Sequence, residues 1–155
     1  MADTKNIADL IRDDNKILET KDVVVKFTLR GQELMPIRGI SLDLYKGESL
    51  AIVGESGSGK SVFTKTFIGM LDKNGWVDNG EIWYNGEDLA KYKTEEQWLK
   101  IRGREIAIVF QDPMTSLDPL MTVGRQVVEA LEHHQGLHGE QAMKRAIEIL
   151  DDVGI

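Results

Sequence analysis

The chain contains no cysteine, and this absence excludes disulfide bonds and zinc sites built on cysteine thiolates. It also lacks an excess of basic residues, because 19 Lys and Arg stand against 26 Asp and Glu and give a net charge of −7. A surface that binds nucleic acid needs a basic stripe to neutralise phosphates, and the basic residues here are interspersed with acidic ones. We therefore expect no nucleic-acid partner.

Long hydrophobic runs are missing as well. The apolar stretches are only a few residues long, far short of the roughly 20 residues that a transmembrane helix needs. No charged and then apolar leader of the kind found in signal peptides is visible. The remaining composition, 41% hydrophobic and 29% charged residues in a chain of 155, is typical of one globular domain. A cytosolic location is the default expectation.

The pattern along the chain mixes short β segments with helical ones. Residues 1–21 are mostly polar and predict a weakly docked leader. β-Branched or alternating segments predict strands at 23–27, 40–45, 48–53, 81–84 and 106–110. Helical spacing, or a capping box at Thr94 and Gln97, predicts helices at 60–71, 94–102, 123–133 and 140–153. Asn85-Gly86 predicts a hairpin turn, and the whole mixture indicates an α/β core with antiparallel additions.

The most informative segment is residues 54–61, Gly-Glu-Ser-Gly-Ser-Gly-Lys-Ser. It matches the phosphate-loop pattern of glycine, four residues, glycine, lysine and then serine or threonine. It also follows an expected strand and opens an expected helix, as that pattern requires. Glycines let the backbone approach an anion closely, and successive N–H groups form a concave nest for phosphate oxygens. The alternative is a glycine-rich turn with a purely structural role.

The residues of this loop have separate expected roles. Lys60 supplies a mobile ammonium for the β- and γ-phosphates. The Ser61 hydroxyl suits Mg²⁺, which keeps several waters and takes few protein ligands. The expected phosphate-binding residues are Gly54, Glu55, Ser56, Gly57, Ser58, Gly59, Lys60 and Ser61. A GTPase would add the motif Asn-Lys-x-Asp, and the chain has none.

A second segment points to one family. Residues 109–119, Val-Phe-Gln-Asp-Pro-Met-Thr-Ser-Leu-Asp-Pro, resemble the Q-loop segment of ABC transporter ATPases, and residues 54–61 resemble their Walker A motif. The Q-loop string is similar to that of the oligopeptide and dipeptide importer branch, in which Asn is commoner at position 118. The resemblance extends over roughly residues 20–155. It implies an α/β fold: a P-loop NTPase core with an antiparallel β subdomain and the start of a helical subdomain.

The resemblance also implies roles for single residues. Phe27 stands where the family has an aromatic that stacks on adenine, and the alternative is a packing residue of a core strand. Gln111 matches the glutamine that reaches Mg²⁺ and the attacking water, so the expected catalytic residues are Gln111 and Lys60 and the expected metal ligands are Ser61 and Gln111. Val62 replaces a common Ser or Thr, which removes a hydroxyl from the α-phosphate but leaves the backbone N–H of Val62 as a cofactor contact.

The function that the resemblance implies is the ATP-binding, energy-coupling subunit of an importer for oligopeptides or dipeptides, with ATP and Mg²⁺ as cofactors. The implied partners are transmembrane permease subunits docked at residues 111–121, a second ATPase subunit and, indirectly, an extracytoplasmic substrate-binding protein. The implied location is the cytoplasmic face of the cell membrane. The alternative function is a regulatory or non-transport ABC-type module that binds nucleotide.

Further motifs of the family are not found in the chain, namely the Leu-Ser-Gly-Gly-Gln signature, the Walker B motif with its glutamate, and the switch histidine. We therefore expect a leader over 1–21, a nucleotide-binding core with β insert and Q-loop over 22–122, and the start of a helical subdomain over 123–155 that ends before the signature. Such an N-terminal portion of a longer subunit is expected to bind Mg-ATP and hydrolyse it poorly, because groups that position and activate water are missing.

Overall fold

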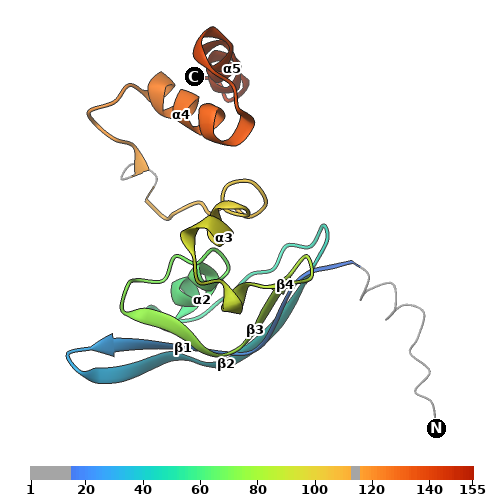
Figure 1. Ribbon diagram of the computed structural model, residues 1–155, viewed down its shortest axis with the longest axis vertical. Coiled ribbons are helices and arrows are strands. Elements are labelled where there is room, and N and C mark those ends of the chain that lie inside the picture. Colours follow the sequence, from blue (N-terminus) through green and yellow to red (C-terminus); the bar gives the residue numbers. More distant parts are fainter. Residues whose placement is uncertain (1–14, 113–115) are drawn as a thin grey trace. The chain divides into compact units, whose positions relative to one another are not determined.

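The computed structural model describes residues 15–112 and 116–155. Contacts divide the chain into two units, one that ends at Ile101 and one that begins at Arg102. The first unit holds an antiparallel sheet with short helices, and the second holds a helical hairpin (Figure 1). The sequence predicts the boundary between the nucleotide-binding core and the helical subdomain between residues 122 and 123, and that domain assignment stays a prediction. Residues 1–14 of the expected leader and 113–115 of the expected Q-loop segment lie outside the described residues.

Antiparallel strands in the order β2-β1-β3-β4 form the sheet of the first unit. Their bounds are Lys16–Leu29 for β1, Gln32–Tyr45 for β2, Gly75–Tyr84 for β3 and Glu87–Asp88 for β4. Its core is made of fully buried aliphatic side chains, among them Val23, Val25, Ile37 and Ile82. The strands predicted at 23–27, 40–45 and 81–84 are confirmed as parts of longer strands.

β1 begins at Lys16, inside the segment 1–21 that the sequence predicts as a polar leader. Leu18 and Thr20 alternate with more exposed neighbours and are both buried. The Thr20 hydroxyl accepts a 2.9 Å hydrogen bond from the backbone N–H of Leu42 on β2. The leader prediction is therefore wrong for residues 16–21. Threonine counts as a polar residue in a sequence pattern, but the hydroxyl of Thr20 forms its hydrogen bond inside the sheet, so the residue can be buried there.

The sheet is irregular where β1 passes Asp22. The pairing register of β1 shifts on both sides at this point, against β2 and against β3. Asp22 has a φ of 46°, and its backbone N–H donates to Ser41 Oγ at 2.9 Å. Gly80 of β3 lies so close that a Cβ there would be 2.5 Å from the carbonyl oxygens of Lys21 and Asp22. Such a bulge raises the local twist of the strands, and only glycine fits opposite it.

Short helices complete the first unit: α2 at Lys60–Thr66, η1 at Leu89–Lys91 and α3 at Glu95–Leu99. The predicted helix at 60–71 is confirmed only as far as Thr66, since the chain turns at Gly69, whose φ is 60°. The indole of Trp98 lies directly against this glycine, where a Cβ would be 2.1 Å from the ring. The capping box of Thr94 and Gln97 is confirmed at the start of α3, which ends earlier than the predicted helix.

Two predicted strands do not form. Residues 48–53 and 106–110 belong to no strand, apart from a single bridge between Arg102 and Ile106. Val53 is 90% exposed and Val109 is 92% exposed. Apolar runs of this kind are typical of parallel strands buried on both faces, and such strands exist only beside hydrogen-bonded neighbours. Among the described residues neither segment has a neighbouring strand, so both predictions are wrong for this chain.

The second unit is built on two helices, α4 at Val123–Gln135 and α5 at Gly139–Asp152. Both confirm predicted helices. Their contact is a small apolar core of Val128, Leu131, Ala142 and Ala146. Alanines one turn apart on α5 let the two backbones approach closely, and Gly136 ends α4 with a left-handed φ of 66°. Within the described ranges, we find no helix whose length and apolar character would let it cross a membrane.

Candidate functional site

The phosphate-loop motif, residues 54–61, forms an exposed loop that leads into α2. Gly57 and Gly59 have φ values of 79° and 94°, a region that side chains other than glycine rarely adopt. The Ser58 N–H donates to the Glu55 carbonyl at 3.2 Å, and the Phe63 N–H donates to the Gly59 carbonyl at 2.8 Å. The loop is therefore a turn followed at once by the first helical hydrogen bond, as the motif predicts.

Lys60 lies across its own loop. Its Nζ donates to the carbonyl oxygens of Gly54 at 2.9 Å and Glu55 at 2.6 Å, and to Ser58 Oγ at 3.4 Å. The loop closes tightly around it, since a Cβ on Gly54 would lie 2.8 Å from Ser58 Oγ. An ammonium held inside a loop of glycine and serine gives a small cationic cradle, which suits phosphate oxygens.

The three residues after Lys60 differ in how far they are exposed to solvent. Ser61 is exposed in the first turn of α2, Val62 is half-buried and Phe63 is buried. The exposed Ser61 hydroxyl is a hard oxygen donor of the kind that Mg²⁺ accepts, so its chemistry and position fit the predicted ligand role. The backbone of Val62 follows it directly along the helix. The contacts expected of Ser61 and Val62 with a nucleotide and its metal stay predictions.

The wall behind the loop comes from the sheet and was not predicted. A Cβ on Gly59 would lie 2.7 Å from Ile37 Cδ1 and 3.1 Å from the Pro36 carbonyl oxygen, so the glycine backbone rests directly on β2. α2 also contacts β2. No local pattern around Ile37 marks this role, although a glycine in the motif signals close backbone approach in general.

Phe27 belongs to β1 in the same unit as the loop. It pairs with Leu34 on β2 and with Gly75 on β3, and it is half-buried. Its ring lies over Gly75, where a Cβ would be only 2.5 Å from the ring carbon Cε1. An aromatic side chain that covers a glycine on a neighbouring strand protects the backbone there. The ring thus has a packing role in the sheet, and its stacking on adenine stays a prediction.

Gln111 belongs to the second unit, where it is exposed and follows the unpaired segment 107–110. Its role as a catalytic residue and metal ligand rests on the resemblance and stays a prediction. Among the described residues, no group of three or more His, Asp and Glu side chains is placed to hold a metal ion. The predicted ligands, a hydroxyl and an amide oxygen, are of a different kind.

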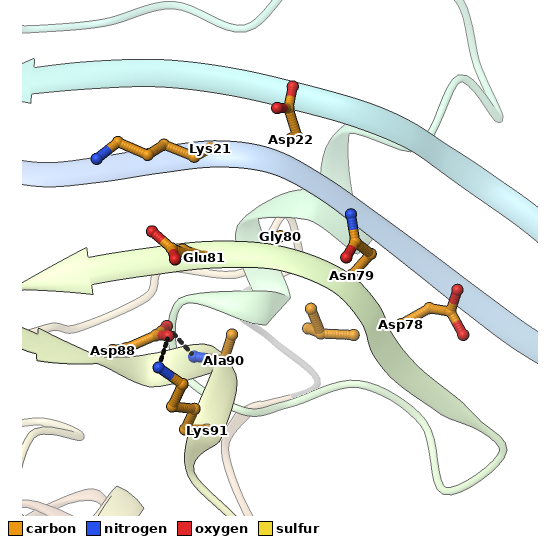
Figure 2. A pocket seen from close by; sticks show the side chains of 10 residues that line it. Lys21, Asp22, Asp78, Asn79, Gly80, Glu81, Asp88, Ala90 and Lys91 are labelled. Atoms are coloured by element: carbon orange, nitrogen blue, oxygen red, sulfur yellow. Dashed lines mark hydrogen bonds and ion pairs between the residues drawn. The ribbon is translucent and has the colours of Figure 1, made fainter.

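A separate hollow of about 560 Å³ lies over β1, β3 and η1. Charged side chains line it, including Asp22, Asp78 and Glu81, with Asp88 at one end. Figure 2 shows Asp88 joined to Ala90 and Lys91, and its Oδ1 also accepts the Ile82 N–H at 3.0 Å. The buried carboxylate is therefore used to tie η1 to β3, and the phosphate-loop residues do not belong to this hollow.

Comparisons with known proteins match most of the chain. A family model described as ABC transporter matches residues 37–155. The oligopeptide transport ATP-binding protein AmiE of Streptococcus pneumoniae is 50% identical over 146 residues, which cover 94% of this chain and 41% of that protein. The dipeptide transport ATP-binding protein DppD of Lactococcus lactis is 50% identical over 143 residues, covering 92% and 41%. The chain thus spans about two fifths of the length of these relatives.

Solved structures resemble the chain as well. The dimeric structure of MJ0796, a bacterial ABC transporter cassette, matches with a TM-score of 0.71 and 26% identity over 87% of this chain and 56% of that one. A dimeric post-hydrolysis state of the same ATP-binding cassette, bound to ADP and Pi, matches with a TM-score of 0.69, 25% identity and the same coverage. The fold of the chain is that of part of such a cassette.

Proposed function

Since this chain belongs to the ABC transporter family, we propose that residues 54–61 bind the phosphates of ATP as part of the ATP-binding subunit of a peptide importer. The observation that carries the proposal is the closed loop around the Lys60 ammonium, with its two left-handed glycines. Relatives at 50% identity that are named for oligopeptide and dipeptide transport support the choice of peptides as the transported class.

The loop itself indicates how binding would proceed. Lys60 exchanges the carbonyl oxygens of Gly54 and Glu55 for phosphate oxygens, which bear more charge and make stronger hydrogen bonds. Backbone N–H groups of the loop and of Val62 donate to the remaining phosphate oxygens. Ser61 and Gln111 would hold Mg²⁺, and that ion, when bound, would neutralise charge on the phosphates. Phe27 would stack on the adenine ring.

The partners and location of the whole subunit form the next part of the proposal. Segment 111–121 would dock on transmembrane permease subunits, which in turn receive solute from an extracytoplasmic binding protein. A second ATP-binding subunit would face this one, and the dimeric state of the similar solved cassette supports that arrangement. Such a subunit works at the cytoplasmic face of the membrane. The solute contacts belong to the other subunits, so the peptide class rests on the relatives' names.

We also propose that the 155-residue chain hydrolyses ATP poorly by itself. Phosphoryl transfer is catalysed mainly by positioning and by neutralisation of charge, and a water-activating group is part of the machinery. The chain supplies the cradle and expected metal ligands, whereas the signature and Walker B motifs are not in its sequence. The chain is therefore expected to bind Mg-ATP but to hydrolyse it poorly.

One experiment tests both statements. Calorimetric titration with Mg-ATP on the 155-residue chain is compared with the same titration on Lys60→Ala, and phosphate release is followed in parallel. We expect Lys60→Ala to weaken binding by about tenfold or more, because a hydrogen-bonded charge is lost. Lys65→Ala is the matched control, since Lys65 lies five residues further along α2 and pairs with Asp72.

Undiminished affinity in Lys60→Ala would refute the phosphate-loop assignment. Phosphate release by the wild-type chain at the rate of a full-length relative would refute the statement about hydrolysis and leave the binding assignment intact.

A further inference from the structure

The left-handed conformation of Gly59 is supported from outside the loop. Glycine has no side chain that could hold its own backbone, and it has more conformations to choose from than any other residue. The Gly59 carbonyl accepts the Phe63 N–H at 2.8 Å, and a neighbouring surface can restrict the glycine further. Ile37 Cδ1 and the Pro36 carbonyl are the atoms that a Cβ on Gly59 would meet first, at 2.7 and 3.1 Å.

Ile37 is itself firmly placed in the sheet. Its side chain is 1% exposed, and on β2 it pairs with Val25 of β1, which is fully buried. The same strand β1 carries Phe27, opposite Leu34. The side chain of Ile37 therefore links the backbone of the loop to the strand pair that carries the expected adenine-stacking ring.

We propose that Ile37 is a positioning residue for the phosphate loop. The Cδ1 methyl of Ile37 holds Gly59 in its left-handed conformation against β2. The inference rests on the proposed function, because it concerns the same loop. Ile37 touches no phosphate. It acts by keeping the N–H groups around Gly59 in one arrangement, so that the loop is ready for an anion before the anion arrives.

The expected change in the apparent Kd for Mg-ATP depends on how often the loop adopts its binding-competent conformation. When the competent conformation of a site is only a fraction of the population, the apparent dissociation constant rises by the inverse of that fraction. Loss of the supporting methyl leaves Gly59 free to visit other conformations. The apparent Kd for Mg-ATP is then expected to rise by about threefold to tenfold, without the loss of any group that contacts the ligand.

The test uses a pair of equal deletions in the 155-residue chain. Ile37→Val removes the Cδ1 methyl that faces Gly59. Ile82→Val removes the same methyl from a fully buried isoleucine of β3, which pairs with Thr20. Both variants lose a similar amount of packing, so comparable drops in melting temperature are expected. Only Ile37→Val is expected to bind Mg-ATP more weakly.

A second ligand separates positioning of the loop from a general effect on the sheet. Inorganic tripolyphosphate carries the phosphates of ATP but no adenine. Ile37→Val is expected to weaken tripolyphosphate and ATP by the same factor. Phe27→Ala, which changes the same strand pair at the expected adenine contact, is expected to weaken ATP alone. Ile37→Leu keeps methyls at the δ position and is expected to restore most of the affinity.

Each outcome of these measurements either supports the positioning role of Ile37 or overturns a stated proposal. Equal affinities in Ile37→Val and Ile82→Val, with Lys60→Ala still defective, would overturn the positioning role and leave the phosphate loop assigned. Normal binding in Lys60→Ala would overturn the proposed function itself. A rise in Kd for ATP and tripolyphosphate that is confined to Ile37→Val, with rescue by Ile37→Leu, establishes the inference.

Discussion

Lys16 and Lys26 are the two residues of β1 that tie it to its neighbours by charge. Lys16 Nζ lies 2.9 Å from Glu19 Oε1 and 3.1 Å from Asp43 Oδ2 on β2. Lys26 Nζ lies 3.0 Å from Asp78 Oδ2 on β3. Hydrogen bonding to Glu19 raises the pKa of Lys16, and hydrogen bonding to Lys16 lowers the pKa of Glu19 below its ordinary value of 4.5.

The lowered pKa of Glu19 predicts how the sheet responds to acid. A carboxyl whose pKa is depressed by folding contributes stability that is fully present above its ordinary value of 4.5 and is lost as the pH falls through its lower folded value. We expect the melting temperature to fall in this window, and to fall less steeply in Glu19→Gln. Melting curves followed by tryptophan fluorescence between pH 6 and about 2.5 measure it. Parallel curves for the two proteins would contradict the assignment.

The residues of the candidate site differ in how far the sequence predicts them. Gly57, Gly59 and Lys60 are part of a contiguous motif, so their spacing alone predicts a phosphate loop in which glycines bring the backbone close to an anion and Lys60 supplies an ammonium. Ile37 belongs to another strand and contacts the loop only after folding. A pattern read along the chain contains no information about that contact, which is why sequence reasoning missed it.

At the scale of elements, one glycine in β3 and one in the turn after it are constrained in different ways. Gly86 completes the hairpin turn to β4 with a φ of 81°, and a Cβ on it would meet no atom within 4 Å. Gly80 has a φ of 94° as well, but a Cβ on it would meet two carbonyl oxygens of β1 at 2.5 Å. An alanine in place of Gly86 would therefore suffer conformational strain alone. An alanine in place of Gly80 would also clash with the backbone of β1.

This difference predicts the ranking of two identical substitutions. Gly86→Ala is expected to lower the free energy of unfolding by about 1–2 kcal/mol, the cost of a left-handed residue with a Cβ. Gly80→Ala is expected to cost about 3 kcal/mol or more, because strain from overpacking is added to it. Urea unfolding of both variants measures the two values. Equal losses would show that the bulge at Asp22 gives way and that the close contact with β1 is not a constraint.

Elements with local signals were predicted well. The turn at Asn85-Gly86 and the capping box at Thr94 and Gln97 depend on neighbours within a few residues, and both are present. The predicted strands at 48–53 and 106–110 failed for the opposite reason. Their apolar character indicates burial in a sheet, but a strand also requires a partner, and the described residues supply none.

At the scale of the whole chain, these two segments leave apolar side chains in contact with water. Val53 is 90% exposed and Val109 is 92% exposed. Backbone groups that belong to no ladder, together with exposed apolar residues, favour pairing with other chains. AmiE is more than twice as long as this chain, which covers 41% of it.

We expect the 155-residue chain to self-associate in a concentration-dependent way. Val109→Lys is expected to lower the average mass measured by light scattering, because charge at an unpaired apolar segment opposes pairing. Leu29→Lys is the matched control: Leu29 is also exposed, but it ends a strand that is paired with β2. A monomer at every concentration in the wild-type chain would refute the expectation. An equal effect of the control would show that net charge alone is responsible.

The order of the strands along the chain also bears on folding kinetics. β1 and β2 are joined by a tight turn, so their hairpin can close within about 1–10 μs. β3 reaches β1 only after the long connection that contains the phosphate loop has closed, which is entropically slower. Trp76 and Trp83 both belong to β3. A refolding chain should therefore show a tryptophan signal that lags behind hairpin formation, and the phosphate loop becomes anchored at both ends only in that later phase.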